Sequence, residues 1–160
     1  MTTAAATRPS LLKVIAGAGL LVGTLDILDA IIFYGLRGVS ATRILQGIAF
    51  GLIGRIAFTQ GTRSAALGLL LHFLIATTWA AIYLLASRQF PLSRHPWISG
   101  TLYGIIVYTV MNYVVLPLSH VGLRPLPPLV PLLNGVGALI VCIGLPLAFI
   151  ARRYAAHRKA

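Results

Sequence analysis

Acidic residues are almost absent from this chain of 160 residues, which contains no glutamate and only two aspartates, Asp26 and Asp29. Few groups are therefore available for acid–base chemistry. The single cysteine, Cys142, excludes an intramolecular disulfide and any zinc or redox motif built from cysteines. Neither a nucleophile elbow, a phosphate-binding glycine loop nor a zinc-protease helix occurs in the sequence. We therefore expect no enzymatic activity, no cofactor and no metal.

Apolar residues dominate instead: 58% of the chain is hydrophobic and 9% is charged. Four apolar segments each reach the roughly 20 residues that a helix needs to cross a bilayer. We predict an all-α polytopic membrane protein, a compact bundle of four transmembrane helices forming one membrane domain over residues 1–160. Pro146 predicts a kink in the last span, because it removes an internal hydrogen bond. The predicted spans are 11–36, 65–86, 97–118 and 129–151.

The segment 40–59, between the first two spans, is apolar but interrupted by polar residues. Ser40 is a suitable N-cap for a helix there. Arg43, Gln46 and Arg55 interrupt its apolar pattern, and it is short for a span. We therefore predict an interfacial or re-entrant helix.

Basic residues give the chain a net charge of +11, and they gather at the ends of the apolar segments. This placement is typical of topological anchors, so nucleic acid is not an expected partner. The N-terminus, the connection 87–96 and the C-terminal tail hold Arg8, Lys13, Arg88, Arg94, Arg152, Arg153, Arg158 and Lys159. The opposite side holds fewer, namely Arg37, Arg43, Arg55, Arg63 and Arg124. The positive-inside rule therefore predicts that both termini are cytoplasmic.

The basic tail 152–160 directly follows the last predicted span. Its cations either bind anionic lipid headgroups or simply anchor the end of the span. The residues concerned are Arg152, Arg153, Arg158 and Lys159.

Each predicted span carries one polar residue at a similar depth. A helix rises about 1.5 Å per residue, so these four residues lie roughly 8 to 10 Å from the membrane surface opposite the chain termini. They are Asp29, His72, Asn112 and Asn134. Asp26 lies about one turn deeper, near the bilayer midplane. We call these five residues the polar layer.

Small residues share a helix face with the polar ones. In the first span, Gly19, Gly23, Asp26 and Ala30 follow the spacing of one stripe, which predicts that Asp26 faces the bundle rather than lipid. The pairs Gly19/Gly23, Gly47/Gly51 and Gly100/Gly104 have the GxxxG spacing. We expect these pairs to serve packing within one subunit.

Two roles are compatible with the polar layer. Its residues either hydrogen-bond to one another, or to an inward-reaching Arg43 or Arg55, and so fix helix register. Alternatively, Asp26 and Asp29 form a proton or cation site in which His72 assists. A divalent metal site from Asp26, Asp29 and His72 is a third possibility, but no spacing motif supports it.

Part of the chain, over 68–153, resembles a known family. The stretch LHFLIATTWAAIYLLASRQFP at 71–91, MNYVVLPL at 111–118 and GLRPLPP at 122–128 are similar to the YagU-like family of bacterial inner-membrane proteins. The resemblance implies a four-helix protein of the inner membrane, with at most a link to acid tolerance. Expected partners are anionic headgroups of the bilayer, and either a second copy of the chain or other membrane subunits.

Overall fold

The computed structural model describes residues 10–159, with side chains described up to residue 156, and every regular element in this part of the chain is a helix. Five helical segments are long and apolar enough to cross a membrane, one more than the four predicted spans. The additional segment is Ala41–Phe58, which the sequence analysis assigned to the membrane interface. The all-α class is thus confirmed for the described residues, and the helices have the length and apolar composition that membrane spans require.

The helices follow one another with short connections. The α-helices are α1 (Leu11–Gly35), α2 (Ala41–Ile53), α3 (Thr62–Gln89), α4 (Pro96–Val110), α5 (Leu116–Leu118), α6 (Leu129–Ala138) and α7 (Leu145–Lys159). Two 3-10 helices, η1 (Gly54–Phe58) and η2 (Leu92–Arg94), and two π-helices, η3 (Met111–Val115) and η4 (Leu139–Gly144), complete the chain.

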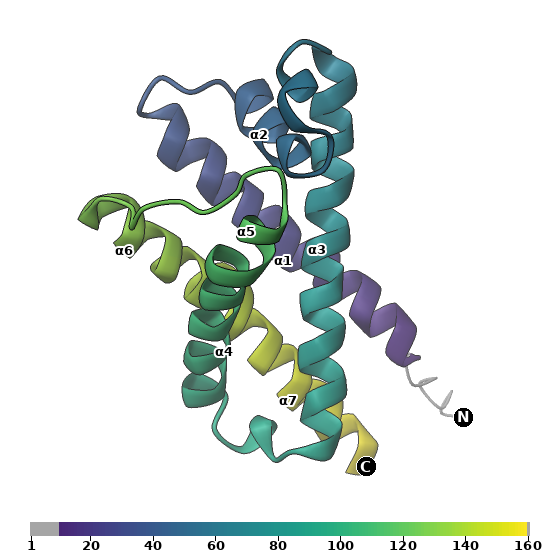
Figure 1. The fold of residues 1–160 in the computed structure, drawn as a ribbon. Helices are drawn as coiled ribbons and strands as arrows, with labels where there is room; N and C mark the ends of the chain where they lie inside the picture. The colour runs from purple at the N-terminus through teal and green to yellow at the C-terminus, as the bar shows by residue number, and fades with distance from the viewer. Residues whose placement is uncertain (1–9, 160) are drawn as a thin grey trace.

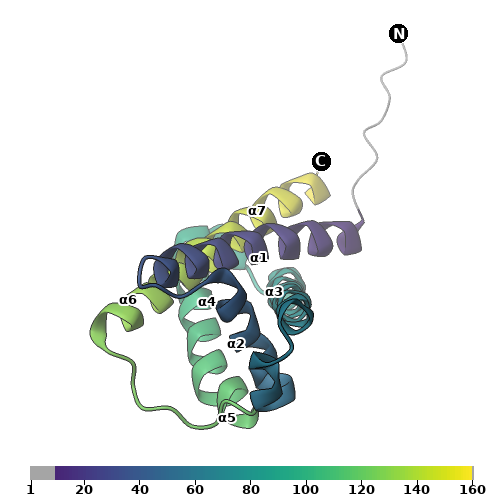
Figure 2. The same ribbon diagram turned by 90° about the horizontal axis from the view of Figure 1, so that it is seen from above.

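Figures 1 and 2 together show that α3 runs along the long axis of the molecule, whereas α1, α4 and the continuous unit α6–η4–α7 are inclined to it. The start of α1, the α3–α4 connection and the end of α7 lie at one end. The connections on either side of α2 and the loop between α5 and α6 lie at the other end. Figure 2 looks nearly along α3, and α2 extends across this view. Helix α2 therefore lies crosswise to α3.

Glycines allow the closest helix contacts, as the GxxxG spacing predicted at Gly19/Gly23 and Gly100/Gly104. A Cβ atom on Gly19 would clash with Thr77, and one on Gly23 would lie 2.8 Å from the Phe73 ring, so α1 packs tightly on α3. A Cβ on Gly104 would lie 2.5 Å from Ile140 Cα, which brings the backbones of α4 and η4 together. Such close approach is the usual role of small residues between membrane helices.

The pair Gly47/Gly51 is different, because the close packing predicted for it is wrong at Gly47. No heavy atom lies within 4 Å of a Cβ built on Gly47, and a Cβ on Gly51 would make only ordinary contacts with Ser119. These two glycines leave space on α2 instead of closing a helix interface.

The apolar core lies between α1, α3, η4 and α7. Its largest fully buried side chains include Tyr83, Leu84 and Leu147. The Tyr83 hydroxyl donates a hydrogen bond of 2.9 Å to Ser99 Oγ, and this serine donates in turn to the Leu92 carbonyl at 2.8 Å. The polar group of a buried tyrosine is thereby satisfied at the base of α4.

Each π-helix comes shortly before a proline. Pro117 follows η3, and Pro146 follows η4. A proline has no N–H for the carbonyl four residues earlier, which here belongs to Tyr113 or Cys142, so the regular hydrogen-bond pattern fails at that turn. Where the sequence predicts a kink at Pro146, the structure has the wider turn of a π-helix just before the proline.

Side-chain hydrogen bonds fix the start of α2 and its connection to α3. At the start of α2 the predicted cap is confirmed, because Ser40 Oγ accepts a hydrogen bond from the Arg43 amide at 3.3 Å. Buried Gln46 donates to the Gly61 carbonyl at 3.0 Å, and buried Ser64 donates to the Ala57 carbonyl at 2.6 Å. The bonds of Gln46 and Ser64 hold α2 and η1 against the start of α3.

Candidate functional site

Asp29 and Asn134 are hydrogen-bonded to each other. Among the described residues, this is the one hydrogen bond between two side chains of the polar layer. Asn134 Nδ2 on α6 donates to Asp29 Oδ2 on α1 over 3.0 Å. Both residues are half-buried. The bond connects the first and the last of the helical segments that are long and apolar enough to cross a membrane, and its residues are 105 positions apart in the chain.

His72 on α3 connects to the backbone of α1. Its Nε2 atom lies 2.7 Å from the Gly23 carbonyl oxygen, and because a carbonyl only accepts, this nitrogen carries the proton of the hydrogen bond. A glycine at position 23 lets α3 come close enough for the contact, since any Cβ there would meet Phe73.

Asp26 and His72 line the same small cavity, which has a volume of about 70 Å³. Its other walls are apolar and come from α3, α4, η3 and η4: Ile75, Ala76, Trp79, Val107, Met111, Leu139 and Ile143. A cavity of this size has room for water if polar groups are there to bind it. The structure therefore brings one carboxyl group and one imidazole together at the level predicted for the bundle interior.

Asn112 does not join the other polar-layer residues. Its amide donates to the Tyr108 carbonyl of its own helix over 2.9 Å. It also lines a separate small cavity with Pro125 and Pro127 of the loop before α6. The depth predicted for Asn112 did not fix the direction of its side chain.

The proposed charge partners also lie elsewhere. The Arg43 guanidinium lies over the Phe58 ring, 3.8 Å from its centroid, and Arg55 is exposed on η1. At the other end of the molecule, Arg152 and Arg153 are exposed on α7, as binding to headgroups requires. The side chains of Arg158 and Lys159 lie outside the described residues.

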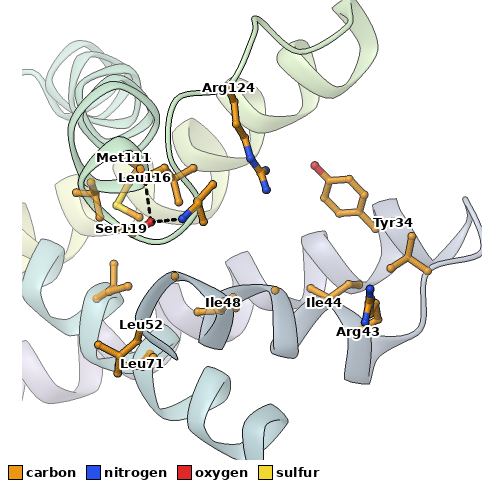
Figure 3. Close-up of a pocket in the computed structure, with 16 residues that line it drawn as sticks. Tyr34, Arg43, Ile44, Ile48, Leu52, Leu71, Met111, Leu116, Ser119 and Arg124 are labelled. Carbon is orange, nitrogen blue, oxygen red and sulfur yellow. Dashed lines mark hydrogen bonds between the residues drawn. The ribbon is translucent and has the colours of Figure 1, made fainter. Parts of the chain in front are cut away.

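Sequence reasoning missed a much larger cavity of about 630 Å³ between α2, α3, η3 and the loop after α5. Figure 3 shows Tyr34, Arg43 and Arg124 near one end of it, with apolar side chains such as Ile48, Leu52 and Leu71 along the rest. Arg43 and Arg124 are distant in the sequence, so no local motif could reveal that they share a cavity. Among the described residues, no three histidine, cysteine, aspartate or glutamate side chains are grouped to hold a metal ion.

The contact between α1 and α6 can be observed directly in a bilayer. The chain has only two aspartates and two asparagines, so labelling aspartate with ¹³C and asparagine with ¹⁵N gives few possible pairs. We expect a solid-state NMR dipolar coupling between Asp29 Cγ and Asn134 Nδ2, since Nδ2 lies 3.0 Å from Oδ2. The coupling should persist in Asn112→Gln and vanish in Asn134→Gln. No coupling in the wild-type protein would show that the two helices do not meet here.

Comparisons with models of protein families, with curated proteins and with solved structures found no match. Three features of the residues themselves therefore bear on the function. These are a carboxyl–amide hydrogen bond between α1 and α6, an imidazole bound to the α1 backbone, and a carboxyl group beside that imidazole.

Proposed function

We propose that the chain is a small integral membrane protein of structural or accessory type, in which the polar layer locks the helices together. The hydrogen bond between Asp29 and Asn134 carries this proposal, because it joins α1 to α6 with groups that lipid cannot satisfy. The contact of His72 with Gly23 joins α3 to α1 in the same way. Every buried side-chain nitrogen or oxygen in the described part of the chain has a hydrogen-bond partner, as a structural role requires.

In this proposal the protein is not an enzyme. One of the two carboxylates is engaged by Asn134, and the other lies in a cavity of only about 70 Å³, too small for most substrates. The resemblance to the YagU-like family supports an inner-membrane location in a bacterium. The partners are a second copy of the chain or other membrane subunits, together with anionic headgroups at the basic tail.

We further propose that four units cross the bilayer, namely α1, α3, α4–α5 and α6–η4–α7, while α2 lies at the interface. The crosswise orientation of α2 in Figure 2 supports this topology. So does its composition, because α2 and η1 carry Arg43, Gln46 and Arg55 within 18 residues. Both chain termini then lie on the cytoplasmic side, where the sequence carries more basic residues.

Cysteine labelling tests the topology. In a Cys142→Ser background, single cysteines at Leu36 and Gln60, both exposed, flank α2 and η1. We expect a membrane-impermeant maleimide to label both from the same, outer side of intact cells, whereas cysteine at exposed Gln89 should react only after permeabilisation. Labelling of Leu36→Cys and Gln60→Cys from opposite sides would mean that α2 crosses the membrane and that five helices span it.

A second candidate function is proton or cation handling, and one observation favours it. Asp26 and His72 face the same cavity, so a proton or a small cation has both a carboxyl group and an imidazole within reach. Ionisable groups inside a membrane protein commonly mark such pathways. In this alternative Asp26 and Asp29 form the site and His72 assists, and the family resemblance links the activity to acid tolerance.

Proton flux separates the two functions. The wild-type protein and the Asp26→Asn, Asp29→Asn double variant are reconstituted at equal folded yield into liposomes that contain a pH-sensitive dye, and a potential is imposed. A Thr78→Val variant, which changes an exposed residue of α3, serves as the control. We expect the same low leak from all three proteins, because the carboxyl groups are structural. Flux in the wild type and control that the double variant abolishes would establish the proton site and contradict the structural proposal.

A further inference from the structure

The large cavity has two chemically different parts. Most of its wall is apolar and consists of side chains from α2, α3 and η3, including Ile44, Ile48, Leu71, Ile75 and Met111. At one end it is lined by Tyr34, Arg43 and Arg124, and Figure 3 shows the Arg124 guanidinium pointing toward Tyr34. The cavity thus combines a long apolar surface with a strongly basic end.

No acidic side chain of the protein can neutralise that basic end. The only two carboxylates of the sequence are Asp26 and Asp29 on α1, and neither lines the cavity. Asp29 is bound to Asn134, and Asp26 lines the separate small cavity with His72. Arg43 rests on the ring of Phe58 rather than on an anion. Arg43 and Arg124 are both exposed and line the same end of the cavity, so an anion that balances their charge must come from another molecule.

The glycines of α2 give this cavity its depth. Gly47 and Gly51 both line it, and a Cβ atom on Gly47 would meet no heavy atom within 4 Å. Glycine in a helix interior is less favourable than alanine, and Gly47 gains no close helix contact in return. The GxxxG spacing on α2 keeps the apolar surface open to a guest.

We propose that this cavity binds an anionic phospholipid, with an acyl chain along the apolar wall and the headgroup phosphate between Arg43 and Arg124. Guanidinium groups bind phosphate oxygens in a bidentate manner, and the volume of about 630 Å³ is within the range of ligand cavities. A second copy of the chain fits poorly, because with a net charge of +11 it has no free carboxylate to offer. The site is distinct from the basic tail, which lies at the opposite end of the molecule.

The headgroup is tested with paired arginine variants of the full-length protein. Each protein is reconstituted with equal amounts of phosphatidylglycerol and phosphatidylcholine, extracted gently, and analysed by native mass spectrometry for retained lipid. We expect selective retention of phosphatidylglycerol, about 30-fold weaker in Arg43→Gln, Arg124→Gln, given about a tenfold effect per 1.4 kcal/mol and about 1 kcal/mol per basic residue. The control Arg55→Gln, Arg63→Gln removes the same charge from exposed positions that do not line the cavity and should retain lipid like the wild type.

The acyl chain is tested by filling the cavity. Gly47→Leu places a side chain in open space at the cavity wall and should abolish retention without lowering thermal stability, whereas Gly17→Leu, also in open space but away from the cavity, should have no effect. Equal retention of both lipids, equal loss in the two arginine pairs, or normal retention in Gly47→Leu would each overturn the proposal. Full displacement of the lipid by soluble glycerol phosphate would also overturn it, because a soluble anion would then be the ligand. A dimer that Gly47→Leu dissociates would overturn it too, because a second copy of the chain would then occupy the cavity.

Discussion

The absence of water from the hydrocarbon core is the constraint on which the rest of the structure depends. A polar group in that region must find its partner inside the protein. Helices satisfy the backbone, and the remaining groups must be matched one by one. Asn134 satisfies Asp29, the Gly23 carbonyl satisfies His72, and the Trp79 carbonyl satisfies the Tyr103 hydroxyl at 2.6 Å. Each of these bonds crosses from one helix to another, so satisfying a polar group also fixes a helix position.

Close packing and polar matching depend on each other. His72 reaches the Gly23 carbonyl because a glycine there lets α1 and α3 approach, and a Cβ atom would collide with Phe73. The contact of Gly104 with Ile140 similarly draws α4 onto the unit that carries Asn134. Where a glycine makes no such contact, as at Gly47, the helices stay apart and a cavity forms. The same residue type thus closes the bundle at one place and opens it at another.

The sequence predicted the helices well because apolar length and the Ser40 cap are local signals. The packing role predicted from the GxxxG spacing is confirmed at Gly19/Gly23 and Gly100/Gly104, but the same spacing predicted it equally for Gly47, which makes no close contact. The sequence could not predict side-chain direction. Asn112 shares the depth of Asp29 yet bonds to its own helix, because the turn at η3 and the neighbouring loop decide where it points. The large cavity escaped prediction for a related reason: it requires Arg43 and Arg124 to meet across the fold.

The central claim is that the hydrogen bond between Asp29 and Asn134 stabilises the bundle, and a double-mutant cycle tests it most directly. Free energies of unfolding are measured in mixed micelles for the wild type, Asp29→Leu, Asn134→Leu and the double variant, whose leucines approximate the size of the original side chains. The account predicts a coupling energy of about 0.6 to 1.7 kcal/mol, so the double variant loses less stability than the two single variants together. A coupling energy of zero would mean that the bond does not lock the helices and would contradict the account.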